Sequence, residues 1–250
     1  HGRLSDAESL FKETLALKRR VLGEENLDTL TVMSNLAVLY CRLKRHAEAE
    51  PLFKEALEGQ RRLLGENNIQ MLGTMNNLAG VYYYQGRFEE AEPLFLEVLE
   101  GEERILGRDH PNTISVRINL AALYAEQKRY GEAEPIFRDA LEKTRSSLGE
   151  DHPLFLELRS NLGGLLISEG RLDEAQPLLV DALESQRRIL GEAHPKTLGV
   201  QQLLVELYQQ QEQWQEALDL ARDLVEKTSP KSPLHAKRKA LLDSITASKG

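Results

Sequence analysis

The sequence of 250 residues has a single cysteine, Cys41, and few aromatic side chains, which make up 6% of the chain. One cysteine excludes a disulfide within the chain and is typical of a reducing compartment, so we expect a cytoplasmic location. The scarcity of aromatic and β-branched residues disfavours strands, whereas abundant Leu, Ala, Glu, Lys, Arg and Gln favour helices. No apolar run approaches the roughly 20 residues that a membrane-spanning helix needs, so we expect no membrane partner.

The sequence also lacks an excess of positive charge and any recognisable catalytic motif. Its formal net charge is −8, and nucleic-acid affinity depends on Lys and Arg contacts with phosphates, so we predict no nucleic-acid partner. No phosphate-binding loop, dinucleotide fingerprint, HExxH or kinase motif occurs, and Cys41 has no recurring histidine partner. We therefore predict no enzymatic activity, no cofactor and no metal site.

What the sequence does contain is one short phrase that recurs at a fixed distance. The phrase reads LGEENL, LGENNI, LGRDHP, LGEDHP and LGEAHP, and the copies begin 42 residues apart at Leu22, Leu64, Leu106, Leu148 and Leu190. A chemical site usually occurs once, whereas a phrase at a constant period indicates a repeat architecture.

Other residues recur with the same period. An alanine recurs without exception, at Ala7, Ala49, Ala91, Ala133, Ala175 and Ala217. An asparagine, an arginine and a phenylalanine recur in most copies. They occur at Asn35, Asn77, Asn119 and Asn161; at Arg45, Arg87, Arg129 and Arg171; and at Phe11, Phe53, Phe95 and Phe137. Apolar residues spaced three and four apart predict two helices per unit. We expect the alanine to lie where the two helices cross, because only a small side chain fits there.

The repeated phrase reads as the punctuation between two units. Leucine closes a helix, glycine caps it, and Pro153 in the fourth copy begins the next helix, where its fixed φ is suitable. The histidines His110, His152 and His194 lie one unit apart and supply one ligand each, whereas zinc takes about four. We interpret them as residues of the helix start and not as metal ligands. Prolines early in the second helices (Pro51, Pro93, Pro135, Pro177) predict that these helices begin late or bend.

At this point the residues resemble a known family. The pattern NLAxLY…GR[FY]xEAEPLF…AL resembles the tetratricopeptide repeat (TPR), and the 42-residue period with the LGxxHPxT turn is similar to the variant in kinesin light chains. The resemblance implies an all-α fold, a right-handed TPR superhelix (α-solenoid) of antiparallel helix pairs with a C-terminal capping helix. The heptad coiled coil by which kinesin light chains join the heavy chain is absent, so nothing here identifies a motor subunit.

Laid on the sequence, the repeat predicts a single array over residues 1–250. Residues 1–23 are the second helix of a truncated repeat, whose partner we expect upstream. Full repeats follow at about 28–65, 70–107, 112–149, 154–191 and 196–228, the last one degenerate, and a capping helix spans 233–248. End units of a stacked array need a polar outer face, which the last repeat and this helix supply. Trp214 occupies the aromatic position of Phe88 and Tyr130, so we expect it in the core.

If TPR geometry carries over, Asn35, Asn77, Asn119 and Asn161 line a concave groove. A row of carboxamides can donate to and accept from a peptide backbone whatever its side chains are. The alternative is that each asparagine only bridges its own turn or a neighbouring helix. We add to the candidate peptide-binding residues the neighbouring positions Ser34, Asn76 and Ile118 and the aromatic residues Tyr83 and Tyr84.

The resemblance implies an adaptor that binds an extended peptide or a partner helix in this groove. An alternative is an intramolecular regulatory or oligomerisation arm of a larger signalling protein, such as a kinase or NTPase, whose partners are other domains of the same chain. The arginine column has two interpretations as well. The arginines line one groove edge and attract acidic residues, or they pair with the many nearby glutamates.

Overall fold

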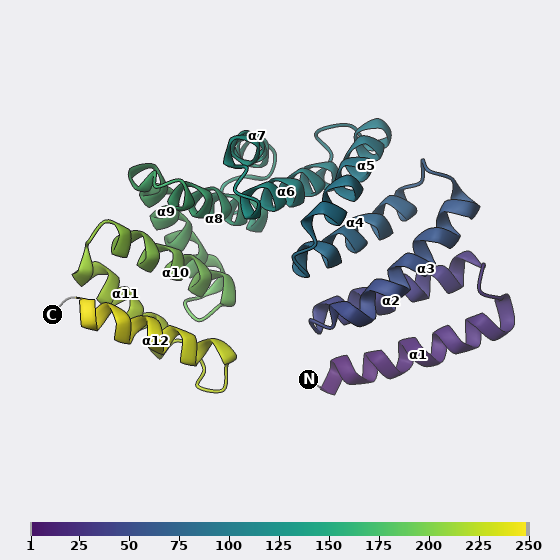
Figure 1. The fold of residues 1–250 in the computed structure, drawn as a ribbon, viewed down its shortest axis with the longest axis horizontal. Coiled ribbons are helices and arrows are strands. Elements are labelled where there is room, and N and C mark those ends of the chain that lie inside the picture. Colours follow the sequence, from purple (N-terminus) through teal and green to yellow (C-terminus); the bar gives the residue numbers. More distant parts are fainter. Residues whose placement is uncertain (1, 249–250) are drawn as a thin grey trace. The chain divides into compact units, whose positions relative to one another are not determined.

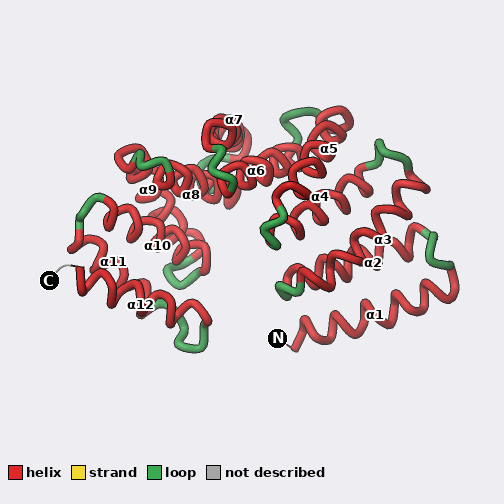
Figure 2. Tube along the Cα trace, in the orientation of Figure 1, coloured by secondary structure: helices red, strands yellow, loops and turns green. Residues whose placement is uncertain are grey.

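The computed structural model describes residues 2–248, which form twelve helices and no strand (Figures 1 and 2). Contacts divide the chain into two compact units, His1–Gln127 and Lys128–Gly250. The first unit holds, in chain order, α1 (Gly2–Leu22), α2 (Leu27–Arg42), α3 (His46–Leu64), α4 (Ile69–Tyr84), α5 (Phe88–Leu106) and α6 (Pro111–Glu126). The second holds α7 (Tyr130–Leu148), α8 (Pro153–Ser168), α9 (Leu172–Leu190), α10 (Pro195–Gln210), α11 (Trp214–Glu226) and α12 (Pro233–Ser248).

Within each unit every helix packs on the next one along the chain. The first helices of successive repeats also contact one another, α2 with α4 and α4 with α6 in the first unit and α8 with α10 in the second. Among the described residues no comparable contact joins consecutive second helices of a unit. The first helices of each unit therefore approach one another more closely than its second helices do. The prediction of an all-α protein built from paired helices is confirmed.

The alanine column is buried in every second helix after α1, whereas Ala7 of α1 is half-buried. Ala49, Ala91, Ala133, Ala175 and Ala217 are all fully buried, and so are the side chains one turn further along, at Phe53, Phe95, Phe137, Leu179 and Ala221. These two recurring positions thus contribute to the core of each of these repeats, since burial of apolar surface is the main favourable contribution to folding.

The LGxxHP phrase ends one helix and starts the next. In the copy at Leu148, Gly149 has φ of 84°, a left-handed conformation that suits glycine. Its N–H donates to the Arg145 carbonyl oxygen at 3.1 Å. His152 Nδ1 accepts from the Leu154 N–H at 3.2 Å, and Pro153 is the first helical residue. His110 and His194 cap their helices in the same way, as do Asn26 and Asn68 through their side-chain oxygens. The interpretation as helix starts is confirmed.

The prolines do not delay the second helices, so the prediction of a late start is wrong. The helix α3 begins at His46, five residues before Pro51, and the other three second helices begin equally early. Ala49, two residues before Pro51, is fully buried and lies in the first turn of α3, so the turn before the proline is already helical. The proline then removes a single backbone donor near the helix start.

At the end of the second unit α12 packs on α11. Ile245 joins a buried cluster with Val205, Ala217, Leu218 and Ala221, and Trp214 packs against this cluster while half-buried itself. Arg238 is 5% exposed, and its Nη1 donates to Thr228 Oγ1 at 2.6 Å.

Candidate functional site

The first helices share an accessible stripe, which we call the first-helix face. Its positions are spaced four, three and four residues apart, as in Thr31, Asn35, Val38 and Arg42, and this spacing keeps them on one side of a helix. In the first unit the stripe continues through Gly73, Asn77, Gly80 and Tyr84 of α4 and Ser115, Asn119, Ala122 and Glu126 of α6. In the second unit it comprises Glu157, Asn161, Gly164 and Ser168 of α8 and Gly199, Leu203, Glu206 and Gln210 of α10.

None of the four recurring asparagines is buried. Asn35 and Asn77 are exposed, and Asn119 and Asn161 are half-buried. Asn119 Nδ2 donates to Asn76 Oδ1 of the preceding first helix at 3.3 Å. Within the described part of the chain the side chains of Asn35, Asn77 and Asn161 have no hydrogen-bond partner. Three of the four amides are therefore free to bind a ligand.

The other candidate residues divide between the face and the core. Ser34 is half-buried, and its Oγ lies 3.3 Å from Thr74 Oγ1 on the next first helix. Ile118 is 7% exposed and contributes to the core, so it offers little surface. Ser34 and Ile118 occupy the same repeat position next to the asparagines, so this column contributes to packing more than to the accessible face.

Tyr83 and Tyr84 form an aromatic ledge at the end of α4. Tyr84 is 72% exposed, and its ring stacks on His46 with centroids 5.2 Å apart. Tyr83 meets Tyr84 edge-on at 5.4 Å. Burial and the neighbouring Glu126 carboxylate raise the pKa of Tyr83 to about 12, so its hydroxyl stays protonated at neutral pH. The ledge offers one rigid, accessible ring, a common feature of binding surfaces.

The first-helix face of the second unit contains a cavity of about 330 Å³. It is lined by Glu157, Ser160, Asn161, Gln186, Lys196, Gly199, Val200 and Leu203. Gln186 is 1% exposed and comes from the second helix α9, behind the first helices. At the rim Lys196 Nζ donates to Glu157 Oε2 at 2.6 Å.

Gln186 belongs to a buried polar column that the sequence analysis missed. The column consists of Gln60, Glu102, Thr144 and Gln186 in α3, α5, α7 and α9, and of Thr228 just after the end of α11, and each is at most 4% exposed. Burial raises the pKa of the Glu102 carboxyl. The column can be found in the sequence by adding the 42-residue period to position 60. It is easily missed, because Glu102 falls at a position that the spacing assigns to an apolar stripe.

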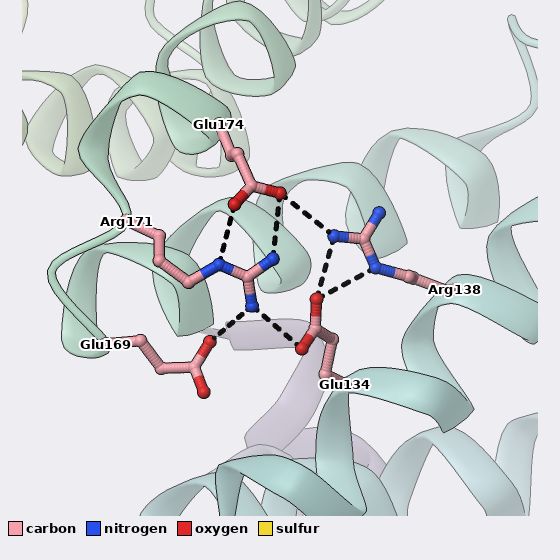
Figure 3. A network of polar contacts seen from close by, with 5 residues as sticks. All are labelled: Glu134, Arg138, Glu169, Arg171 and Glu174. Atoms are coloured by element: carbon pink, nitrogen blue, oxygen red, sulfur yellow. Dashed lines mark hydrogen bonds and ion pairs between the residues drawn. The ribbon is translucent and has the colours of Figure 1, made fainter.

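The recurring arginines pair with glutamates, which agrees with the second of the two interpretations given above. Arg171 links three elements: its Nη1 donates to Glu134 of α7 at 2.8 Å and to Glu169 at the end of α8 at 2.9 Å, and its Nε donates to Glu174 of α9 at 2.7 Å (Figure 3). Arg138 bridges Glu134 and Glu174 from the opposite side.

The same arrangement recurs in the first unit. Arg87 donates to Glu50 of the preceding second helix and to Glu90 of its own, and its guanidinium lies over the Tyr82 ring at 4.2 Å. Arg45 repeats this with Glu8, Glu48 and Tyr40. The Arg, Glu and Tyr columns of the repeat therefore hold successive helices together.

Two classes of site are missing from residues 2–248. No group of three or more His, Cys, Asp or Glu side chains there is arranged to hold a metal ion. None of the helices in this range is long and apolar enough to cross a membrane.

Comparisons with known proteins agree with this architecture. The family model of the tetratricopeptide repeat matches residues 2–62, 70–146 and 154–226. A search of curated proteins found no match.

Several solved structures share the fold. A putative kinesin light chain of Podosopora anserina with nearly identical TPR-like repeats is 25% identical, with a TM-score of 0.67 over 80% of this chain and 95% of that one. BtubC (BKLC) from P. vanneervenii is 20% identical, with a TM-score of 0.70 over 92% and 94%. NprR, solved with its cognate peptide NprX, is 20% identical, with a TM-score of 0.70 over 95% and 67%.

Proposed function

Because this chain belongs to the tetratricopeptide repeat family, we propose that it is a protein-interaction scaffold that binds an extended peptide or a partner helix along its first-helix face. The observation that carries the proposal is the set of free amides on that face, on Asn35, Asn77 and Asn161. An amide both donates and accepts, so it pairs with the backbone of an extended peptide.

The shape and chemistry of the face support the same function. Gly80 leaves open space, since an added Cβ there would meet nothing within 4 Å, and Tyr84 offers an exposed ring beside it. In the first unit the middle of the face is uncharged, with Arg42 and Glu126 at its edge. A peptide backbone flanked by neutral side chains suits such a surface better than a phosphate chain does.

Affinity capture with a double variant tests this proposal. We expect Asn35→Ala with Asn77→Ala, two exposed amides of the first unit, to reduce recovery of a captured partner at least about tenfold, the effect of losing two hydrogen bonds. The matched control is Glu58→Ala with Glu100→Ala, two exposed residues at one repeat position of α3 and α5. If the double amide variant folds normally and recovers as much partner as this control, the first-helix face is not the binding surface.

A second candidate function, association through α1, has its own observation. Leu10, Leu17 and Val21 form a stripe on α1 and are 65%, 51% and 66% exposed. Of the corresponding positions of α3, Leu52 is half-buried and Gly59 is buried against Leu30 of α2, whereas Leu63 is 48% exposed. We infer an oligomerisation or intramolecular docking arm here. Light scattering over a range of concentrations should show association that Leu10→Glu with Leu17→Glu removes, and a single unchanging mass would contradict self-association.

A further inference from the structure

The ring of Tyr84, at the end of α4, has one covered face and one accessible face. His46 of α3 stacks on one face with the two ring planes 14° apart, yet 72% of Tyr84 is exposed. Tyr83 meets the ring edge-on, and Tyr83 in turn packs against Phe88 of α5 with ring centroids 5.9 Å apart. The Tyr84 ring is therefore supported by its neighbours, and its face opposite His46 is open to a partner.

The chain itself shows what two of its other tyrosine rings bind. The Arg87 guanidinium lies 4.2 Å from the centroid of the Tyr82 ring, and the Arg45 guanidinium lies 4.4 Å from that of Tyr40. Each of these arginines also donates to two glutamates. Within the described residues no Lys or Arg lies over Tyr84. An accessible ring face attracts a cation through the ring quadrupole.

A carboxylate without a basic partner comes from the next first helix. Glu126 occupies on α6 the repeat position of Tyr84, is exposed, and makes no ion pair within residues 2–248. The helices α4 and α6 are in contact, and packed helices have axes about 8–10 Å apart. Glu126 is close enough to the Tyr83 hydroxyl to raise the pKa of Tyr83. The carboxylate therefore lies beside the aromatic ledge.

The ends of the two helices add to the negative potential. Tyr84 is the last residue of α4 and Glu126 is the last residue of α6, and a helix C-terminus carries partial negative charge. Neither helix has a basic residue in its last turn, whereas α2 has Arg42 there. Arg87, three residues after Tyr84, already pairs with two glutamates. A positive charge is therefore favoured between Tyr84 and Glu126.

We propose that the aromatic ledge is a subsite for an arginine of the bound peptide. The guanidinium of this arginine lies on the open face of Tyr84 and donates to the Glu126 carboxylate, as Arg87 does with Tyr82 and its glutamates. Arginine suits both contacts, because its planar group stacks on rings and donates to carboxylates through several N–H groups. This subsite deepens the proposed peptide binding and rests on it. It predicts that partners present a basic residue to the first unit.

Small probes of similar shape and different charge test the subsite without knowledge of the partner. The probes are the N-acetyl methylamides of arginine, of citrulline, whose side chain ends in an uncharged urea group, and of glutamate. Binding is followed by NMR through the ring signals of Tyr83 and Tyr84. We expect saturable shifts with the arginine probe and about fivefold weaker binding of the citrulline probe. This preference should shrink in 1 M NaCl, which screens charges.

Three variants and a matched control complete the experiment. Glu126→Gln and Tyr84→Leu should each reduce the preference for the arginine probe to at most about twofold, since each removes one of the two contacts. Tyr84→Phe keeps the ring and should keep the preference, as should the control Glu100→Gln, which changes an exposed glutamate of α5.

Several results would overturn the subsite. They are equal binding of the arginine and citrulline probes, stronger binding of the glutamate probe, no saturable shift in the unaltered protein, or a full preference in Glu126→Gln or in Tyr84→Leu.

The outcome is distinguishable from failure of the proposed function. Capture with the Asn35 and Asn77 variant tests the first-helix face, whereas the probes test the aromatic ledge alone. Loss of capture in that variant together with equal binding of the arginine and citrulline probes would retain the binding face and remove the arginine subsite. A clear arginine preference with unchanged capture would remove the proposed function while the ledge still binds arginine.

Discussion

At the residue scale, one position of the repeat is filled by different side chains with the same role. Asn26 and Asn68 accept a backbone N–H through Oδ1, and His110, His152 and His194 accept it through Nδ1. Each removes one unpaired donor at a helix start. The histidines thus have a structural role that needs no ligand.

Substitution at this position should separate the capping role from other roles. We expect His152→Ala to lower the free energy of unfolding by about 1 kcal/mol, because the Leu154 N–H loses its acceptor. His152→Asn should change it by less than about 0.5 kcal/mol, since the first two repeats use asparagine. Urea unfolding followed by circular dichroism measures both, and equal effects of the two substitutions would argue against capping.

Glu102 predicts a pH dependence. Burial raises the pKa of its carboxyl in the folded protein, so this group's contribution to stability is present below its ordinary pKa of 4.5 and is lost as pH rises through the folded value. Glu102→Gln should therefore raise the free energy of unfolding at pH 7 by roughly 1 kcal/mol and leave it nearly unchanged at pH 4. Exposed Glu100→Gln is the control. A gain of the same size at both pH values would exclude this explanation.

At the element scale, ion-pair networks join successive helix pairs. Arg171 is a third exposed, while Glu134 and Glu169 are about one fifth exposed, so the network is partly shielded from solvent. Such networks contribute more than isolated surface pairs.

A substitution in this network should differ from one in an exposed pair. We expect Arg171→Ala to lower the free energy of unfolding, and by less in 1 M NaCl, which screens charges. Arg188→Ala removes a pair with Asp151 in which both side chains are more than 60% exposed, and it should lower the free energy of unfolding by clearly less than Arg171→Ala does. Thermal and urea unfolding of both variants would show the difference, and equal losses would contradict a special role for the network.

The period of the sequence determines the helices, because a crossing needs a small residue and a helix end needs glycine at the same place in every repeat. Ala91 and Gly149 were therefore predictable as packing and turn residues. The cavity was not, because it depends on how Gln186 of a second helix reaches between two first helices. The buried polar column and the helix start before Pro51 were not predicted for a related reason: the sequence alone does not show that a polar residue is buried or that a helix starts before a proline.

At the scale of the whole molecule, the repeats place equivalent residues at the same position of successive helix pairs. In the first unit Asn35, Asn77 and Asn119 occupy equivalent positions of α2, α4 and α6, and the contacts between these helices keep the positions adjacent. In the second unit Asn161 lies beside the cavity. The central claim is that partners bind this face and not the second helices.

Site-specific photo-crosslinking tests that claim most directly. A photoreactive benzoylphenylalanine is placed at Gly73 or Gly80 of the first-helix face, where added atoms meet open space, and at Glu58 or Glu100 of the second helices as controls. We predict that a captured partner crosslinks at Gly73 and Gly80 and not at the two control positions. Crosslinks concentrated at Glu58 and Glu100 would contradict the account.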